Sequence, residues 1–146
     1  MNVQLDVNAP ILPWKGLGNI PLYTTIKELR HWLDAMRAKS LLIGRFWIRY
    51  EIKDVVYLFF DLTNGKLFKL VALSGYKGSL FNKIYVGQPE EEALRLEPSF
   101  EYDDFEEVFV SPKGVFLETD PCTHTVDCIS VFVKELETDT FERGDW

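Results

Sequence analysis

The sequence predicts a single α+β domain in which two similar strand–helix–three-strand halves form a mainly antiparallel sheet with helices on one face. Its 146 residues suit one domain, and a hydrophobic fraction of 47% is ample for a core. Aromatic residues make up 14% of the chain, which favours strands because aromatic side chains pack well on a half-buried sheet. Residues 15–75 and 76–135 read alike, and residues 136–146 follow them as an acidic tail.

The similarity between the halves is clearest in the segments that are predicted to be strands. Around Gly65, "DVVYLFFDLTNGKLFKLVAL" predicts a hairpin, and Asn64-Gly65 suits a type I′ turn, in which both central residues have positive φ. "KGVFLETD" repeats the first strand of that hairpin 59 residues later, and "CISVFV" repeats the second strand at an offset of 61. Either the chain contains a duplication, or apolar strands simply align tolerably with one another.

One helix is predicted near the start of each half. Thr25 and Glu28 form a T-x-x-E capping box for the first helix. Pro89 is expected at the first helical position of the second, where the glutamates at 90–92 suit the positive end of the helix dipole. Apolar residues at helical spacing predict the buried side of each helix. They are Ile26, Leu29, Trp32, Leu33 and Met36 in the first helix and Ala93, Leu94 and Leu96 in the second.

Negative charge is concentrated in the second half, above all in residues 101–107, "EYDDFEE". This run is expected to precede a strand that begins near Glu107, with Asp103 and Asp104 in the approach to it. Residues 1–75 hold ten Lys/Arg and six Asp/Glu, whereas residues 76–146 hold six and seventeen. The distribution argues against nucleic acid as a partner, because phosphates demand a basic surface, and it is compatible with a basic protein. A solvated charged turn is the simplest alternative.

The sequence contains no signature of catalysis, and we expect neither an enzyme nor a cofactor. Cys122, His124, Asp127 and Cys128 form a compact set that could draw zinc, but their spacing matches no common structural-zinc pattern. The segment is better explained as a hairpin loop, so no metal site is predicted. The only other histidine, His31, is interpreted as a structural residue of the first helix.

Targeting signals are also missing from the sequence. The N-terminal residues lack the basic segment and the continuous apolar core of a secretory signal, and no run approaches the roughly 18 apolar residues of a membrane span. Two cysteines do not make the disulfide framework of a small secreted domain. We therefore expect a cytoplasmic protein without a membrane partner.

A small acidic, aromatic-rich domain without catalytic residues resembles the immunity proteins of bacterial polymorphic toxin systems, which include contact-dependent growth inhibition. The tandem layout of residues 15–135 is similar to the repeated unit of β-lactamase-inhibitor-type folds. The first resemblance implies a protein that binds one cognate toxin domain and blocks its active site. An acidic surface suits this task if the toxin is a nuclease, because carboxylates can mimic the phosphates that its cationic site binds.

The acidic run and the strand after it supply the expected partner-binding residues. These are Glu101, Tyr102, Asp103, Asp104, Phe105, Glu106, Glu107, Glu118 and Asp120. The C-terminal segment 136–146 is a second acidic candidate. Two other classes of function stay open. A small-molecule-binding module would use an apolar concavity between the halves, lined by residues such as Trp47 and Phe60, and a structural or oligomeric module would pair through exposed strand edges.

Overall fold

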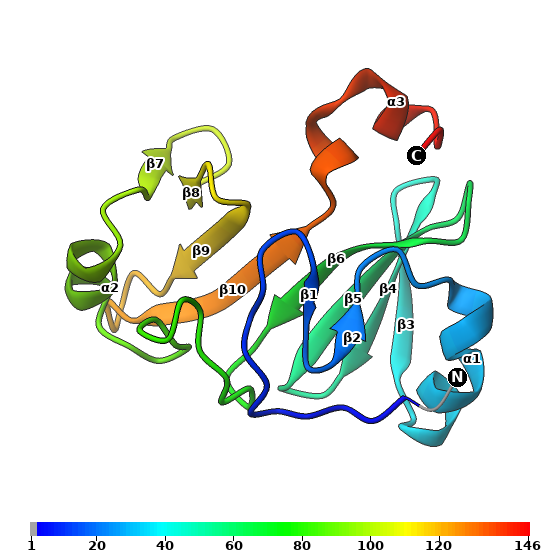
Figure 1. Cartoon of the computed structure of the whole chain (residues 1–146), viewed down its shortest axis with the longest axis horizontal. Coiled ribbons are helices and arrows are strands. Elements are labelled where there is room, and N and C mark those ends of the chain that lie inside the picture. The colour runs from blue at the N-terminus through cyan, green and yellow to red at the C-terminus, as the bar shows by residue number, and fades with distance from the viewer. Residues whose placement is uncertain (1–2) are drawn as a thin grey trace.

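The computed structural model describes residues 3–146 and confirms the prediction of a single α+β domain (Figure 1). It contains a two-stranded sheet and an eight-stranded sheet, and neighbouring strands pair antiparallel in both. In chain order the elements are β1 Gly16–Leu17, β2 Ile20–Pro21, α1 Ile26–Ala35, β3 Lys39–Ile43, β4 Trp47–Ile52, β5 Val56–Asp61, β6 Leu67–Ala72, α2 Glu90–Leu96, β7 Glu101–Asp103, β8 Val108–Ser111, β9 Val115–Thr119, β10 Val126–Phe132, the 3₁₀ helix η1 Lys134–Glu137 and α3 Asp139–Glu142.

The large sheet has the strand order β3-β4-β5-β6-β10-β9-β8-β7, so each half contributes four consecutive strands. The last strand of each half meets the other at the centre, where Ala72 pairs with Ile129 and Lys69 with Phe132. Each half therefore has one strand more after its helix than the sequence predicts. The extra strands are β3 in the first half and β7 in the second, where residues 101–103 were expected to be an irregular approach to β8.

Both halves carry the same irregularity in their last hairpin. Between β5 and β6 the pairing moves from Phe59–Lys69 to Phe60–Leu67, which leaves Phe68 as a bulge. Between β9 and β10 it moves from Glu118–Cys128 to Thr119–Val126, which leaves Asp127 as a bulge. The two bulges lie 59 residues apart. The structural offset of the last strand is therefore 59 rather than the 61 inferred from residue types.

The loops of these two hairpins also match, although the type I′ turn is wrong. Only Gly65 of the Asn64-Gly65 pair has positive φ, at 75°, and its amide donates to the Asp61 carbonyl at 2.6 Å. His124 occupies the corresponding place with φ of 56°, and its amide donates to the Asp120 carbonyl at 2.8 Å. Each hairpin is thus closed by a longer loop with a single left-handed residue at this position.

The main core lies between the convex face of the sheet and a layer formed by the helices α1 and α2, the β1–β2 hairpin and the connection from β6 to α2. The capping box is confirmed, since Glu28 N donates to Thr25 Oγ1 at 3.2 Å and Thr25 N to Glu28 Oε1 at 3.3 Å. Leu29, Leu33 and Ala93 are buried in one cluster with apolar residues of the central strands. Pro89 is the N-cap of α2 rather than its first helical residue.

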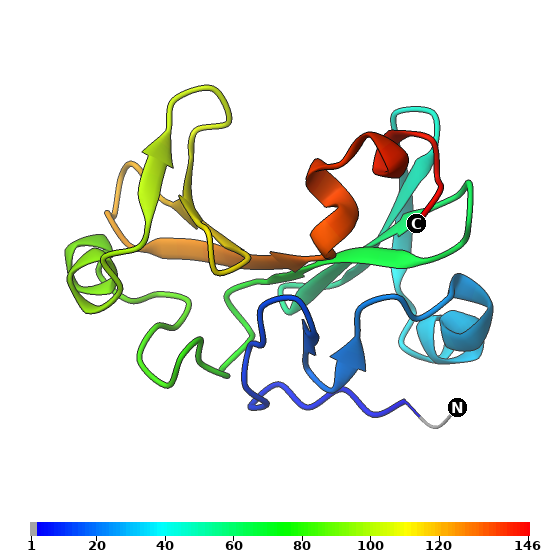
Figure 2. The same ribbon diagram turned by 45° about the horizontal axis from the view of Figure 1, so that its top comes forward.

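The opposite face of the sheet is concave, and the C-terminal segment lies over it. Figure 2 shows the two ends of the sheet rising on the same side, with η1 and α3 between them. Phe141 of α3 is buried, and its ring centroid lies 5.1 Å from that of Phe68. The ring of Trp146 lies 5.3 Å from Phe141, and its Nε1 donates to Asp61 Oδ2 at 2.9 Å. The segment expected to be an acidic tail is therefore packed against the domain.

Replacement of Phe141 tests this packing. Phe141→Ala should lower the free energy of unfolding by about 3–5 kcal/mol, because it opens a cavity beside Phe68 and Trp146. The neighbouring exposed residue supplies the control, since Glu142→Ala should change stability by less than about 0.5 kcal/mol. Urea unfolding measures both. Equal stabilities for the two variants would mean that the segment does not pack as described.

Candidate functional site

The concave face contains a cleft of about 440 Å³ that is lined by both halves of the chain. Trp47 and Phe59 come from the first half, Phe116 comes from the second, and Phe68 lies at the bulge of β6. Leu136 and Glu137 of η1 complete the cleft from the C-terminal segment. An aromatic surface of this kind offers a large apolar contact area to a ligand or to a protein side chain.

Four carboxylates line the same cleft, namely Asp103, Glu106, Glu118 and Glu137. None of them forms an ion pair within residues 3–146. Glu118 Oε2 accepts a hydrogen bond from the Cys128 thiol at 2.7 Å, which leaves its charge uncompensated. Burial, together with Glu118, raises the pKa of Cys128, which favours the protonated thiol that donates this hydrogen bond.

Among residues 3–146, Lys69 is the one cation that lines the cleft. Its Nζ lies 5.1 Å from the centroid of the Phe59 ring, in the range of a cation–π contact. Within the described residues no carboxylate lies close enough to form an ion pair with it. Burial lowers the pKa of Lys69, while Glu118 and Glu106 act in the opposite direction. The cleft is therefore net negative, with one partly buried ammonium in it.

The two halves differ in character at corresponding positions of this face. The cross-strand pair Phe59–Lys69 of the first half corresponds to Glu118–Cys128 of the second, at the offset of 59. An aromatic ring and a cation in the first half are thus replaced by a carboxylate and a thiol in the second half. The fold scheme is shared, but the charge of the concave face is not.

The residues expected from the sequence are only partly brought together. Asp103, Glu106 and Glu118 line the cleft, whereas Glu101, Tyr102 and Asp104 line a neighbouring hollow beside Trp14 and Phe132. Phe105 and Glu107 lie in the turn between β7 and β8, where Phe105 is 90% exposed. Asp120 lies in the β9–β10 loop, and its Oδ1 accepts from Cys122 N at 2.7 Å. Asp120 therefore closes a loop and lines neither cavity.

One other sequence expectation is corrected by the side-chain positions. Trp47 does line the concavity, but Phe60 is fully buried and pairs with Leu67 in the core. Cys122 is exposed in the loop, while Cys128 is buried in β10. Within residues 3–146 no group of three or more His, Cys, Asp or Glu residues could hold a metal ion.

Sequence reasoning missed Lys69, Phe68 and Phe116 as residues of the site. Lys69 had a usable signal, because it is the single charged residue of the apolar strand "LFKLVA". Phe68 gave no such signal, because its position on the concave face depends on the bulge. Glu137 belongs to the C-terminal segment that was the second acidic candidate, but its position in the cleft depends on the packing of η1, which the sequence does not show.

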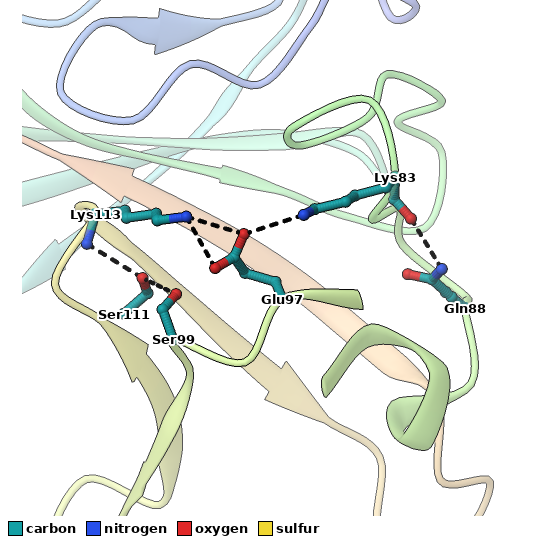
Figure 3. Close-up of polar contacts among 6 residues, drawn as sticks. All are labelled: Lys83, Gln88, Glu97, Ser99, Ser111 and Lys113. Atoms are coloured by element: carbon teal, nitrogen blue, oxygen red, sulfur yellow. Dashed lines mark hydrogen bonds and ion pairs between the residues drawn. The ribbon is translucent and has the colours of Figure 1, made fainter. Parts of the chain in front are cut away.

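An ion-pair network anchors the segment that leads into the acidic wall, which consists of the carboxylates Asp103, Asp104 and Glu106 of the β7–β8 hairpin (Figure 3). Glu97, directly after α2, is only 3% exposed. Its Oε2 accepts from Lys113 Nζ at 3.0 Å, and its Oε1 lies 3.4 Å from Lys83 Nζ. Ser99 lowers the pKa of Glu97, as do Lys113 and Lys83, and the pKa reaches about 2 although burial opposes the shift. Three separate segments are thereby joined at the base of β7 and β8.

The comparisons with known proteins place the fold but no family. No family model matches the chain, and no curated protein matches it. A cysteine-rich secretory protein from Staphylococcus aureus has a similar solved structure, with a TM-score of 0.52 and 14% sequence identity. The match covers 97% of this chain and 53% of that protein, so the chain spans about half of its neighbour's length. Among residues 3–146, no helix has both the length and the apolar character needed to cross a bilayer.

The Asp103 carboxylate organises the turn as well as lining the cleft. Its Oδ1 accepts from Phe105 N at 2.9 Å and from Glu106 N at 3.1 Å. Asp103→Asn keeps an acceptor oxygen and should leave stability nearly unchanged, whereas Asp103→Ala should cost about 1 kcal/mol. Chemical unfolding of both variants measures the difference. An asparagine variant as unstable as the alanine variant would exclude this role for the side-chain oxygen.

The Glu97 network should make stability depend on pH. Because the folded-state pKa of Glu97 lies below the ordinary value of 4.5, its ionised form stabilises the fold above pH 4.5, and this contribution is lost as the pH falls toward 2. Glu97→Gln should therefore cost roughly 2–3 kcal/mol near pH 7 and much less near pH 2.

Unfolding of the Glu97 variant across this pH range, beside Glu91→Gln on the exposed side of α2, measures the effect. The control should track the parent chain at every pH. A loss of stability in Glu97→Gln that stays constant from pH 7 to pH 2 would contradict a role for the ionised carboxylate.

Proposed function

We propose that this chain is a non-enzymatic inhibitor of the immunity type, which binds a cognate basic toxin domain in the cytoplasm and neutralises it. The observation that carries the proposal is the set of carboxylates on the concave face, which have no cationic partner within residues 3–146. Concentrated like charge destabilises a folded chain through self-repulsion. A basic protein surface that fits into the concavity would remove this repulsion on binding.

Nuclease-type toxins suit this surface by their charge. An enzyme that cleaves nucleic acid needs a cationic surface for phosphates, and carboxylates placed on that surface can occupy the same contacts. Opposite charges on the two proteins also steer their encounter, toward ~10⁸–10⁹ M⁻¹s⁻¹ at low salt. Fast capture is the property that protection against an entering toxin requires.

Exposed aromatic residues beside the carboxylates supply candidate anchors. Phe105 projects from the β7–β8 turn, and Tyr102 of β7 is half exposed while its ring packs 5.1 Å from that of Phe109. Aromatic side chains at the centre of an interface contribute disproportionately to affinity, and their burial slows dissociation. The charges would then set the rate of association, and the aromatic residues would set the lifetime of the complex.

A second candidate function is small-molecule binding, which the cleft volume favours. About 440 Å³ lies within the range of pockets that hold small ligands, and the floor of the cleft is aromatic. Native mass spectrometry of the purified chain distinguishes the two functions. A stoichiometric adduct would favour ligand binding, whereas a bare mass is the expected result for the inhibitor.

The toxin partner should be the variable C-terminal domain of a large secreted protein encoded immediately upstream. Co-expression of the chain should rescue growth, and the double variant Asp104→Lys/Glu106→Lys should reduce the association rate constant by about tenfold to a hundredfold at low salt. These two side chains are exposed, so the melting temperature should stay the same. Stopped-flow fluorescence measures the rate, and calorimetry measures the melting temperature.

A double variant with the same change in net charge serves as the control. Asp34→Lys/Glu91→Lys alters exposed residues of α1 and α2, away from the concave face, and should leave association nearly unchanged in physiological salt. Equal rate losses in the two double variants would contradict docking at the acidic wall. Failure of the chain to rescue growth would contradict the proposed function itself.

A further inference from the structure

The cleft on the concave face combines an aromatic surface with a carboxylate surface. The partly exposed aromatic side chains of Phe59 and Phe116 line it beside four carboxylates that form no ion pair within residues 3–146. A purely apolar ligand would leave the carboxylates desolvated, and a purely ionic ligand would leave the aromatic floor uncovered. The occupant that satisfies both is a cation with a flat apolar face.

Among protein side chains, arginine has this character. Its guanidinium is planar and weakly hydrated, stacks on aromatic rings and binds carboxylates through two parallel N–H donors. A lysine ammonium is a compact, strongly hydrated charge that gains less from an aromatic floor. The residues available to an inserted guanidinium are Asp103 and Glu106 from the β7–β8 side, Glu118 from β9 and the ring of Phe116.

We propose that this cleft is an arginine-binding pocket, which receives one arginine side chain from a loop of the bound protein. The proposal rests on the proposed function, since it assumes a protein partner for the concave face. It adds the chemistry of the contact: stacking on the aromatic floor and pairing with the carboxylate wall. The positive guanidinium would be attracted by the four carboxylates of the cleft, and this attraction would be reduced by the ammonium of Lys69.

The resident ammonium of Lys69 makes the proposal sharply testable. Lys69 lines the same cleft, with its Nζ over the Phe59 ring and no ion-pair partner within residues 3–146. An arginine entering the cleft is repelled by this charge, whereas a partner carboxylate would be attracted to it. Removal of the lysine charge must therefore change affinity in opposite directions for the two kinds of ligand.

The test titrates short blocked peptides onto the full chain and follows backbone amide shifts by NMR. The peptides are acetyl-Gly-Xaa-Gly-amide with arginine, lysine, citrulline or glutamate in the middle position. Citrulline is the matched control because it keeps the shape of arginine and lacks its charge. The arginine peptide should bind about tenfold more tightly than the citrulline peptide and about threefold more tightly than the lysine peptide. The shifts should concentrate at Phe116, Glu118 and Lys69.

Three variants complete the test. Glu118→Gln should weaken binding of the arginine peptide severalfold, and Lys69→Met should strengthen it severalfold. Glu106→Gln should also weaken binding of the arginine peptide. Because Glu106 lies in an exposed turn, this substitution should not disturb folding. Loss of arginine binding in Lys69→Met, preference for the glutamate peptide, or no binding of any peptide would each overturn the proposal.

The outcomes separate this proposal from the proposed function. If no peptide binds but the toxin domain still depends on Asp104 and Glu106, the arginine pocket is wrong and the inhibitor function stands. If the arginine peptide binds as expected but the chain does not rescue growth, the pocket stands and its partner is another arginine-bearing protein.

Discussion

The antiparallel pairing of β6 with β10 is the interaction on which the rest of the structure depends. Four residues of each strand, from Lys69–Phe132 to Ala72–Ile129, join two four-stranded sheets into one. Strand twist then accumulates over eight strands and curves the sheet, so that its two ends rise on the same side (Figure 2). The cleft exists only because this register places Lys69 of one half on the same face as Glu118 of the other.

The two faces of the sheet serve different purposes. The convex face holds the core, where Leu58, Leu70 and Leu117 are fully buried in one cluster with residues of the β1–β2 hairpin and of the helices. The concave face carries the unpaired charges, and it is stabilised from outside the sheet by the C-terminal segment and by the Glu97 network. Strong anchoring of this kind lets a domain tolerate charge repulsion at a surface that is reserved for a partner.

Local sequence signals predicted the structural features that depend on residues close together in the chain. The capping box of Thr25 and Glu28 identified α1, and the matched hairpins indicated two similar halves. Features that depend on distant contacts were out of reach. A three-residue strand such as β7 has no periodicity to detect, and the inward position of Phe68 follows from a bulge. The acidic run supplies Asp103 and Glu106 to the lining of the cleft, but composition could not show that Asp120 folds away to close a loop.

Hydrogen–deuterium exchange of the chain, alone and bound to its toxin domain, tests the central claim most directly. The account predicts slower exchange on binding in residues 101–110, in residues 115–119 and in residues 67–70, which together form the acidic wall and the floor of the cleft. Protection confined to the edge strand β3, or to the helices of the convex face, would contradict it.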